Sequence, residues 1–294
     1  MAESAIPVDL FNPGQVFACL GFVEAAEVLL GDAEGAFNWS DPSATTFRLR
    51  APGDGNPVAK VLRFLSEAEV SALSPTGSSL DTGKWGVRAG APADCHVFPF
   101  PVPDSPATLP LAFRQGESVI IVDHWGDATR RDNVKFWAGS GGYPGVALAR
   151  DAQALLPKAP DNIAGDPFAF QATQTSSFRF DWRRDYVPLD AGFSPNDHAA
   201  IVMTGYPVVE LTAAIGMSNA RPARPDPRNK LEYRYAVPGS ADAALYPPPL
   251  LRAALGAGEE FVPGLPLRRF RMFLNWPGQE GQARAITDVV EETE

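Results

Sequence analysis

Apolar residues recur at helical spacing in two segments near the start of the chain. Between Asn12-Pro13 and Gly31 they fall near one stripe: Val16, Phe17, Leu20, Val23, Val28 and Leu29. From residue 57 to about residue 68 they form one face: Val58, Val61, Leu62 and Leu65. Asn followed by Pro is typical of a helix start, and Gly of a helix end. Both segments are therefore predicted to be helices, and Asn12 is predicted to cap the first.

Four other segments alternate apolar and polar residues with a period of two, which is typical of strands that bury one face. They lie at residues 47–50, at 178–183 overlapping a predicted strand region 168–182, at 231–237 and at 267–274. Residues 118–125 contain a continuous apolar run and are predicted to form a buried strand. Further helices are expected at 144–156 and 207–217, and loops at 71–117 and 218–229. The acidic tail 291–294 is expected to fray.

Helices and strands do not alternate regularly along the chain, which favours an α+β fold over a doubly wound sheet. We expect an antiparallel or mixed sheet, short helices and long loops rich in Pro and Gly. Residues 1–157 form an N-terminal α/β region and residues 158–294 a sheet-rich C-terminal region, as two domains or as one continuous domain. The segments 13–21 and 207–216 both start with Pro and end with Gly, which indicates either an internal duplication or ordinary helix punctuation.

Composition narrows the possible functions. The chain has 294 residues, of which 45% are hydrophobic, with 29 Pro, 26 Gly and a net charge of −10. A free-standing nucleic-acid-binding domain usually has a basic balance, so any such contact is expected to be local or within a larger basic assembly. The longest apolar run, 16–23, is far shorter than the ~20 residues that span a bilayer. The N-terminus lacks a basic signal-peptide region, and two cysteines favour a reducing cytoplasm.

The sequence offers few candidates for catalysis. Ser140 lies between glycines but lacks the pattern of a nucleophile elbow. The Gly-rich run 139–145 matches neither a dinucleotide fingerprint nor a P-loop, and no Cys-x-x-Cys motif is present. Asp123, His124 and Asp127 at the end of the predicted buried strand leave one alternative, a metal-dependent nuclease or hydrolase. We expect a protein without enzymatic activity, cofactor or bound metal.

Basic residues on the polar sides of the predicted strands are the main candidates for binding. Residues 179–271 contain 12 Lys and Arg against 10 Asp and Glu, so the acidic excess lies elsewhere in the chain. Arginine binds phosphate well because its planar guanidinium donates two parallel hydrogen bonds. The predicted nucleic-acid contacts are Arg48, Arg50, Arg179, Arg183, Arg184, Arg234, Arg269 and Arg271 on strands, and Arg221, Arg224, Arg228 and Lys230 in the loop. The alternatives are a sheet face of internal salt bridges and a protein interface.

Residues 12–25, with the sequence Asn-Pro-Gly-Gln-Val-Phe-Ala-Cys-Leu-Gly-Phe-Val-Glu-Ala, resemble the opening helix of a CRISPR-associated family from type I-U (or I-G) systems. Three later stretches also resemble that family. They are Lys-Phe-Trp-Ala-Gly at 135–139, Leu-Asp-Ala-Gly-Phe-Ser-Pro-Asn at 189–196, and 206–222 with its Glu210, Gly216 and Arg221-Pro222. The matches are spread over residues 9–225, so the resemblance covers most of the chain.

The resemblance implies a non-catalytic, large-subunit-like component of a Cascade effector complex in antiviral defence. Such complexes hold a CRISPR RNA and open target DNA against it. In related complexes this component reads the protospacer-adjacent motif and helps to recruit a helicase-nuclease. The implied partners are CRISPR RNA, target DNA, the other Cascade subunits and that helicase-nuclease. A net charge of −10 is unusual for a protein that reads DNA directly. It fits a subunit whose acidic side faces basic partner subunits. A purely architectural subunit is a further alternative.

Overall fold

The computed structural model describes residues 1–73, 89–90, 110–123, 145–174, 176–184, 203–226, 228–239, 244–256, 264–275 and 285–292. Within these ranges lie the helices α1 (Pro13–Leu30), α2 (Pro57–Glu67), α3 (Gly145–Gln153), α4 (Pro207–Asn219) and α5 (Pro248–Leu255). Short 3-10 helices cover Leu156–Lys158, Ile163–Gly165, Pro167–Ala169 and Trp182–Arg184.

The described strands form four small sheets. The first has the order β1-β3-β2, from β1 (Ala2–Pro7), β2 (Glu34–Asn38) and β3 (Thr46–Ala51). The second has the order β5-β4-β6-β7, from β4 (Glu69–Leu73), β5 (Ala89–Gly90), β6 (Leu111–Gln115) and β7 (Ser118–Val122). The third pairs β8 (Ala172–Thr173) with β9 (Thr204–Gly205), and the fourth has the order β10-β11-β12, from β10 (Glu232–Pro238), β11 (Leu267–Asn275) and β12 (Ala285–Glu292). Among these pairings only β4 with β5 is parallel, which confirms the predicted α+β class.

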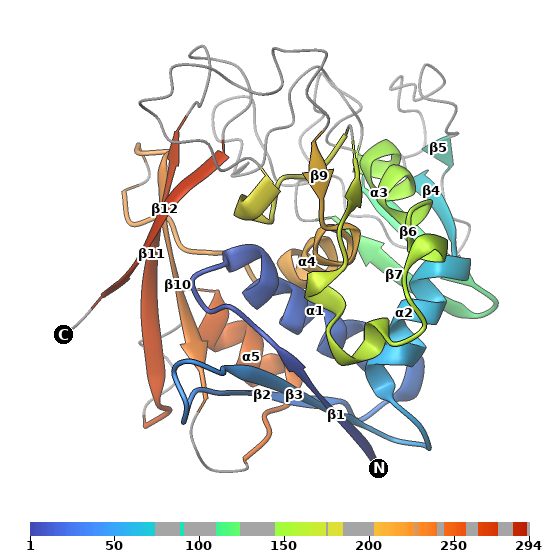
Figure 1. The fold of residues 1–294 in the computed structure, drawn as a ribbon, viewed down its shortest axis with the longest axis horizontal. Helices are drawn as coiled ribbons and strands as arrows, with labels where there is room; N and C mark the ends of the chain where they lie inside the picture. The colour runs from blue at the N-terminus through green and yellow to red at the C-terminus, as the bar shows by residue number, and fades with distance from the viewer. Residues whose placement is uncertain are drawn as a thin grey trace.

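Helices α1 and α4 occupy the middle of the molecule. Figure 1 shows them between the β10–β12 sheet on one side and the β4–β7 sheet on the other, with the β1–β3 sheet below. One hydrophobic core contains residues from both sides of position 157, including Phe17 and Phe22 of α1 together with Leu211 of α4 and Phe270 of β11. The same core thus joins the two regions that the sequence distinguishes.

Helix α1 has the predicted start, and Asn12 caps it by accepting a hydrogen bond from the Gln15 N–H at 3.3 Å. The expected one-sided stripe is wrong, however. Residues 13–26 are buried on every side, polar Glu24 among them, whereas Val28 of the predicted stripe is 49% exposed. Helix α1 is covered mainly by α4, and also by α2, α5, β3 and β7, so residues 13–26 leave no face to solvent.

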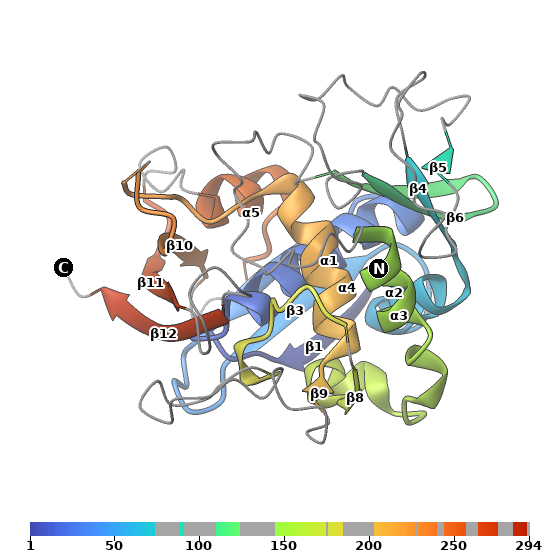
Figure 2. The same ribbon diagram turned by 90° about the horizontal axis from the view of Figure 1, so that it is seen from above.

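Two glycines permit the close approach of α1 and α4, which cross in Figure 2. A Cβ on Gly21 would lie 1.8 Å from the Thr212 carbonyl oxygen, and one on Gly216 would lie 2.0 Å from the Phe17 carbonyl oxygen. These glycines therefore lie inside the helices, and Gly31 caps the end of α1 as the pattern predicts. The two segments that look alike in the sequence are packed against each other.

By length and composition α1 is apolar enough to cross a membrane, and 78% of it is buried inside the fold. A buried core helix passes the same test of length and composition. The packing of α1 against α4 accounts for its apolar sequence without a bilayer.

Of the other helices, strands and loops that the pattern predicts, some are confirmed and others are wrong. The predictions of α2, α3, α4, β3, β7, β10 and β11 are confirmed within their described residues. The loop at 71–117 is wrong where β4, β5 and β6 lie, and the tail residues Glu291 and Glu292 belong to β12 and do not fray. The strand region at 168–182 is wrong apart from the two residues of β8. β1, β2, α5 and most of β12 have no counterpart among the predicted elements.

Candidate nucleic-acid interface

The predicted arginines of β3 contact carboxylates on the neighbouring strands. Arg48 donates to Glu3 of β1 at 2.7 Å, and Arg50 forms an ion pair with Glu34 of β2. Both arginines lie on the polar side of β3, since Phe47 and Leu49, which alternate with them, are fully buried. The predicted alternation of β3 is confirmed.

The β10–β12 sheet carries a denser set of ion pairs. Glu292 of β12 accepts from Arg234 at 2.9 Å and from Arg271 at 2.5 Å. Arg271 also lies 3.3 Å from Glu232, and Arg269 is opposite Glu292 in the strand register. These groups lie on one face of the sheet, and Arg268 pairs with Glu291 at 2.6 Å on the other face.

These contacts match the alternative of a sheet face held by internal salt bridges. The groups are partly exposed, with side-chain exposures of 32% for Arg271 and 22% for Glu292. Exposed pairs of this kind each contribute about 0.2–1 kcal/mol. Contact of Arg48, Arg50, Arg234, Arg269 and Arg271 with phosphate stays a prediction, and phosphate would have to compete with these carboxylates.

The segment 176–184 is a folded loop and not a strand. Arg179 has a left-handed backbone, with φ of 63°. The Arg179 and Phe180 N–H groups donate to the Glu210 carboxylate at 3.0 and 3.1 Å. Because this carboxylate takes the donors that a sheet neighbour would need, the predicted strand cannot form. The rings of Phe178 and Phe180 still point inward, and they stack at 5.2 Å.

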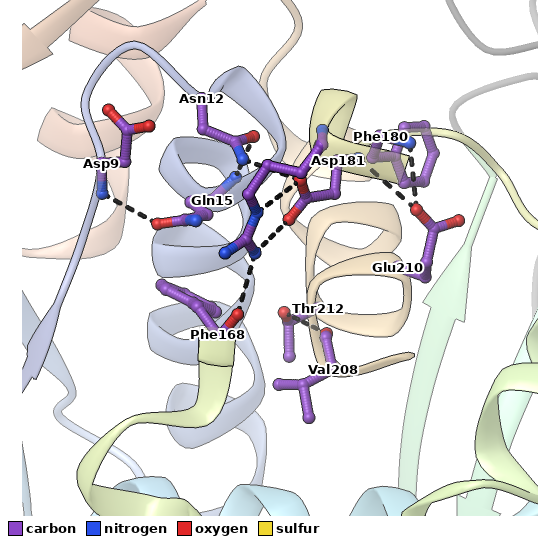
Figure 3. Close-up of polar contacts among 10 residues, drawn as sticks. Asp9, Asn12, Gln15, Phe168, Phe180, Asp181, Val208, Glu210 and Thr212 are labelled. Carbon is purple, nitrogen blue, oxygen red and sulfur yellow. Dashed lines mark hydrogen bonds and ion pairs between the residues drawn. The ribbon is translucent and has the colours of Figure 1, made fainter. Parts of the chain in front are cut away.

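Asp181 was expected on the polar side of a strand, yet it is fully buried. One carboxylate oxygen accepts from the Asn12 amide at 2.9 Å and from Arg183 Nε at 2.9 Å, and the other accepts from Arg183 Nη2 at 2.6 Å. Figure 3 shows Asn12 and Asp181 between the starts of α1 and α4. We refer to Asn12, Ser177, Asp181, Arg183 and Glu210 as the polar cluster.

Glu210 in the first turn of α4 is the second buried carboxylate of the polar cluster. Besides the two backbone N–H groups it accepts from the Ser177 hydroxyl at 2.7 Å. Burial raises the pKa of Glu210, and the hydrogen bond from Ser177 and the charge of Arg184 oppose that rise. The donors aimed at both carboxylate oxygens explain how an acid can be buried here.

Two predicted contact residues of the loop 176–184, Arg183 and Arg184, make contacts within the fold. Arg183 lies over the Tyr206 ring, 3.7 Å from its centroid, and donates to the Phe168 carbonyl at 2.8 Å. Arg184 is 5% exposed and donates to the Gln174 carbonyl at 3.3 Å. These two predicted contact residues fix the loop to its surroundings.

The predicted basic loop 218–229 is partly ordered by β10. The Ala223 N–H donates to the Arg234 carbonyl at 2.7 Å, and the Arg234 N–H returns a hydrogen bond at 2.8 Å. Arg221 and Arg224 on either side of Ala223 line a pocket of about 500 Å³ together with Arg252 of α5. Arg228 is exposed and Lys230 half-buried nearby along the chain.

The candidates for catalysis fall mostly beyond the described residues. This applies to His124, Asp127 and Ser140. The Asp123 N–H donates to the Ser218 hydroxyl at 3.2 Å, which joins the end of β7 to α4. Across the described ranges no three His, Cys, Asp or Glu side chains are grouped to hold a metal ion.

Several side chains at these sites have no clear signal in the local sequence. Arg252 went unnoticed because α5 was not predicted, although the Pro-rich run before it could have indicated a helix start. Nothing in the local pattern connects Arg252 with its partner Glu24 on α1, or Asn12 with Asp181. Glu210 was noted only within the family-like stretch.

The chain matches no family model, no curated protein and no solved structure.

Proposed function

We propose that this protein is a non-catalytic subunit of a type I Cascade complex that acts in the cytoplasm. It would contact CRISPR RNA and target DNA beside the protospacer-adjacent motif, bind the other Cascade subunits and help to recruit the helicase-nuclease. The support is the resemblance of four stretches to the type I-U (I-G) family, together with the place of two of them in the fold.

Those two stretches are the observation that carries the proposal. Residues 12–25 and 206–222 are distant in the sequence, yet they form α1 and α4, which cross at the centre of the fold. Asn12 from one and Glu210 from the other hold the same loop, 176–184. The residues of these two family-like stretches therefore lie together, which supports a common origin for the two matches. The other two stretches, 135–139 and 189–196, lie outside the described residues.

The experiment is a purification of the tagged full chain from cells that express it with a CRISPR array and the neighbouring CRISPR-associated proteins. We expect the chain to co-purify with those proteins and with RNA that contains the repeat sequence. The matched control is an array with a scrambled repeat, which should abolish the RNA signal.

Two results would overturn the proposal. One is a chain that recovers neither the repeat-containing RNA nor the other subunits. The other is cleavage of DNA or RNA by the purified chain with a divalent metal, lost on chelation and in His124→Ala, which would favour the nuclease alternative.

A further inference from the structure

A pocket of about 480 Å³ lies in the segment 160–171, and we refer to it as the 160–171 pocket. This segment contains two of the short 3-10 helices, Ile163–Gly165 and Pro167–Ala169, within the continuously described stretch 145–174. In Figure 1 it is the yellow-green stretch next to α2. The volume is within the range of small-ligand sites.

The core holds this segment in place. Pro167 and Phe168 are buried, and the Phe168 ring packs against Phe22 of α1 with 6.0 Å between the ring centroids. The Phe168 carbonyl also accepts a hydrogen bond from Arg183 of the polar cluster at 2.8 Å. A ligand would therefore meet a pocket with a fixed frame, which reduces the entropy lost on binding.

The lining of the 160–171 pocket combines an aromatic ring with polar side chains. Phe170 lines the pocket and is partly buried, because it packs against the core. Asn162, Asp166 and Gln171 also line the pocket, and all three are exposed. Asn162 and Asp166 precede the two 3-10 helices, yet neither side chain caps its helix. Their amide and carboxylate groups are therefore available to a ligand.

These groups match a nucleobase that carries an exocyclic amino group. An aromatic side chain stacks on the flat face of any base. A carboxylate accepts a hydrogen bond from the amino group of cytosine, and a carboxamide can donate to and accept from the edge of a base. Asp166 also repels a phosphate, since the two groups carry the same charge. A base would therefore enter the pocket and leave its backbone outside.

We infer that the 160–171 pocket binds one unpaired nucleobase with an exocyclic amino group, stacked on Phe170 and hydrogen-bonded to Asp166. Cytosine carries an amino group where uracil carries a carbonyl oxygen, so the pocket should favour cytosine over uracil. The inference rests on the proposed function for the supply of single-stranded nucleic acid, and it adds a base contact to the predicted arginine contacts.

The test measures binding of fluorescein-labelled 12-nucleotide RNAs, one of cytidine and one of uridine, to the full chain by anisotropy at low salt. We expect the wild type to bind the cytidine RNA about tenfold more tightly. In Asp166→Asn this preference should disappear, because a carboxamide can donate to uracil as well as accept from cytosine. The control Asp161→Asn removes the same charge from an exposed residue of the same segment that does not line the pocket, and it should keep the preference.

A second pair of variants tests the stacking contact. Phe170→Leu removes the ring, so we expect both RNAs to bind about tenfold more weakly while the preference for cytidine remains. Phe170→Tyr keeps a ring at this position and should retain the affinity for both RNAs. Circular dichroism and thermal melting verify that each variant is folded.

Four outcomes would overturn the inference. The wild type would bind the two RNAs equally, Asp166→Asn would keep the preference, or the chain would bind neither RNA at low salt. Displacement of the RNA by the oligosaccharide maltoheptaose would indicate a carbohydrate site.

The outcome can be separated from that of the co-purification. Equal binding of the two RNAs by a chain that co-purifies with the Cascade subunits would remove only this inference. A preference for cytidine in a chain that recovers no such subunits would remove only the proposed function.

Discussion

The polar cluster between α1 and α4 and the ion pairs of the β10–β12 sheet use the same chemistry in different surroundings. Both join arginine to carboxylate, but Asp181 is fully buried whereas Glu292 keeps 22% side-chain exposure. Breaking a buried pair leaves a charge that water cannot reach, whereas an exposed partner is rehydrated. The cluster therefore specifies where the loop 176–184 lies, and the sheet pairs tolerate substitution.

The largest expected effect is at the glycine crossing beneath the polar cluster. In Gly21→Val the added side chain meets the Thr212 backbone, which cannot move aside without separating α1 from α4. We expect a loss of at least about 3 kcal/mol of unfolding free energy, or no folded protein. Urea denaturation measures it. Gly165→Ala is the control, because a Cβ there meets nothing within 4 Å, and equal losses in both variants would contradict the prediction.

The next effect compares the two kinds of carboxylate directly. In Asp181→Asn an amide N–H group faces the donors of Arg183 or Asn12, so buried hydrogen bonds break and the variant should lose about 3 kcal/mol of unfolding free energy. Glu292→Gln on the sheet should cost about 1 kcal/mol or less. Denaturation of both variants under the same conditions measures the difference. Similar losses of unfolding free energy would show that the buried carboxylate contributes no more to stability than the exposed one.

The two regions should also respond to pH with opposite signs. Burial raises the folded-state pKa of Glu210 above its ordinary 4.5, so its contribution to stability falls as pH rises from 4.5 through that raised pKa. The hydrogen bond from Arg268 lowers the pKa of Glu291, so its contribution is present above 4.5 and is lost as pH falls through the lowered value.

Unfolding free energies of Glu210→Gln and Glu291→Gln between pH 3 and 8, each subtracted from the wild type, isolate these contributions. The Glu210 difference should favour the wild type less as pH rises, and the Glu291 difference should favour it more. Two differences of the same sign would refute the comparison.

A smaller effect is expected for Cys19, a buried residue of α1 that carries no polar role. Burial raises the pKa of its thiol, so the reactive thiolate is suppressed in the folded chain. Cys19→Ala should cost about 1 kcal/mol of unfolding free energy, because it deletes one buried atom. A bulky thiol reagent should label Cys19 slowly in the native chain, and rapid labelling without denaturant would count against this placement.

The smallest effect is expected for the sheet arginines. In Arg269→Gln/Arg271→Gln the loss of partly exposed ion pairs should change the unfolding free energy by about 1 kcal/mol. If both arginines contact phosphate, the salt slope of nucleic-acid binding flattens by roughly one unit per contact. Because Arg271 already pairs with carboxylates, we expect the salt slope of binding to change less than in Arg221→Gln/Arg224→Gln of the loop 218–229. A larger change of the salt slope would indicate that the sheet arginines are the main nucleic-acid contacts.

Local sequence predicted those parts of the fold that depend on local physics. Asn-Pro pairs start α1 and α2 as expected, and the alternation of β3, β10 and β11 places their aromatic and aliphatic residues inside. The loop 176–184 was not predicted, because its conformation depends on Asn12 and Glu210, which are distant in the sequence. Alternation alone cannot distinguish a strand from a loop whose N–H groups bond to a buried carboxylate.

The candidate site shows the same limit. The arginines were found by composition, but their acidic partners come from other strands whose register the sequence does not reveal. Arg221 and Arg224 were recognised as a basic loop, whereas the pocket needs α5 and its Arg252. The three arginines come together only when two helix ends meet.

The pairing of α1 with α4 has a consequence for the order of events during synthesis. About 190 residues separate Leu30 from Asn219. At about 5–20 residues per second, a ribosome needs roughly 10–40 s to make the partner that covers α1. For that time an 18-residue apolar segment emerges without its packing partner. Nascent chains shorter than about 219 residues should therefore depend on chaperones that shield this segment, and should aggregate when released early.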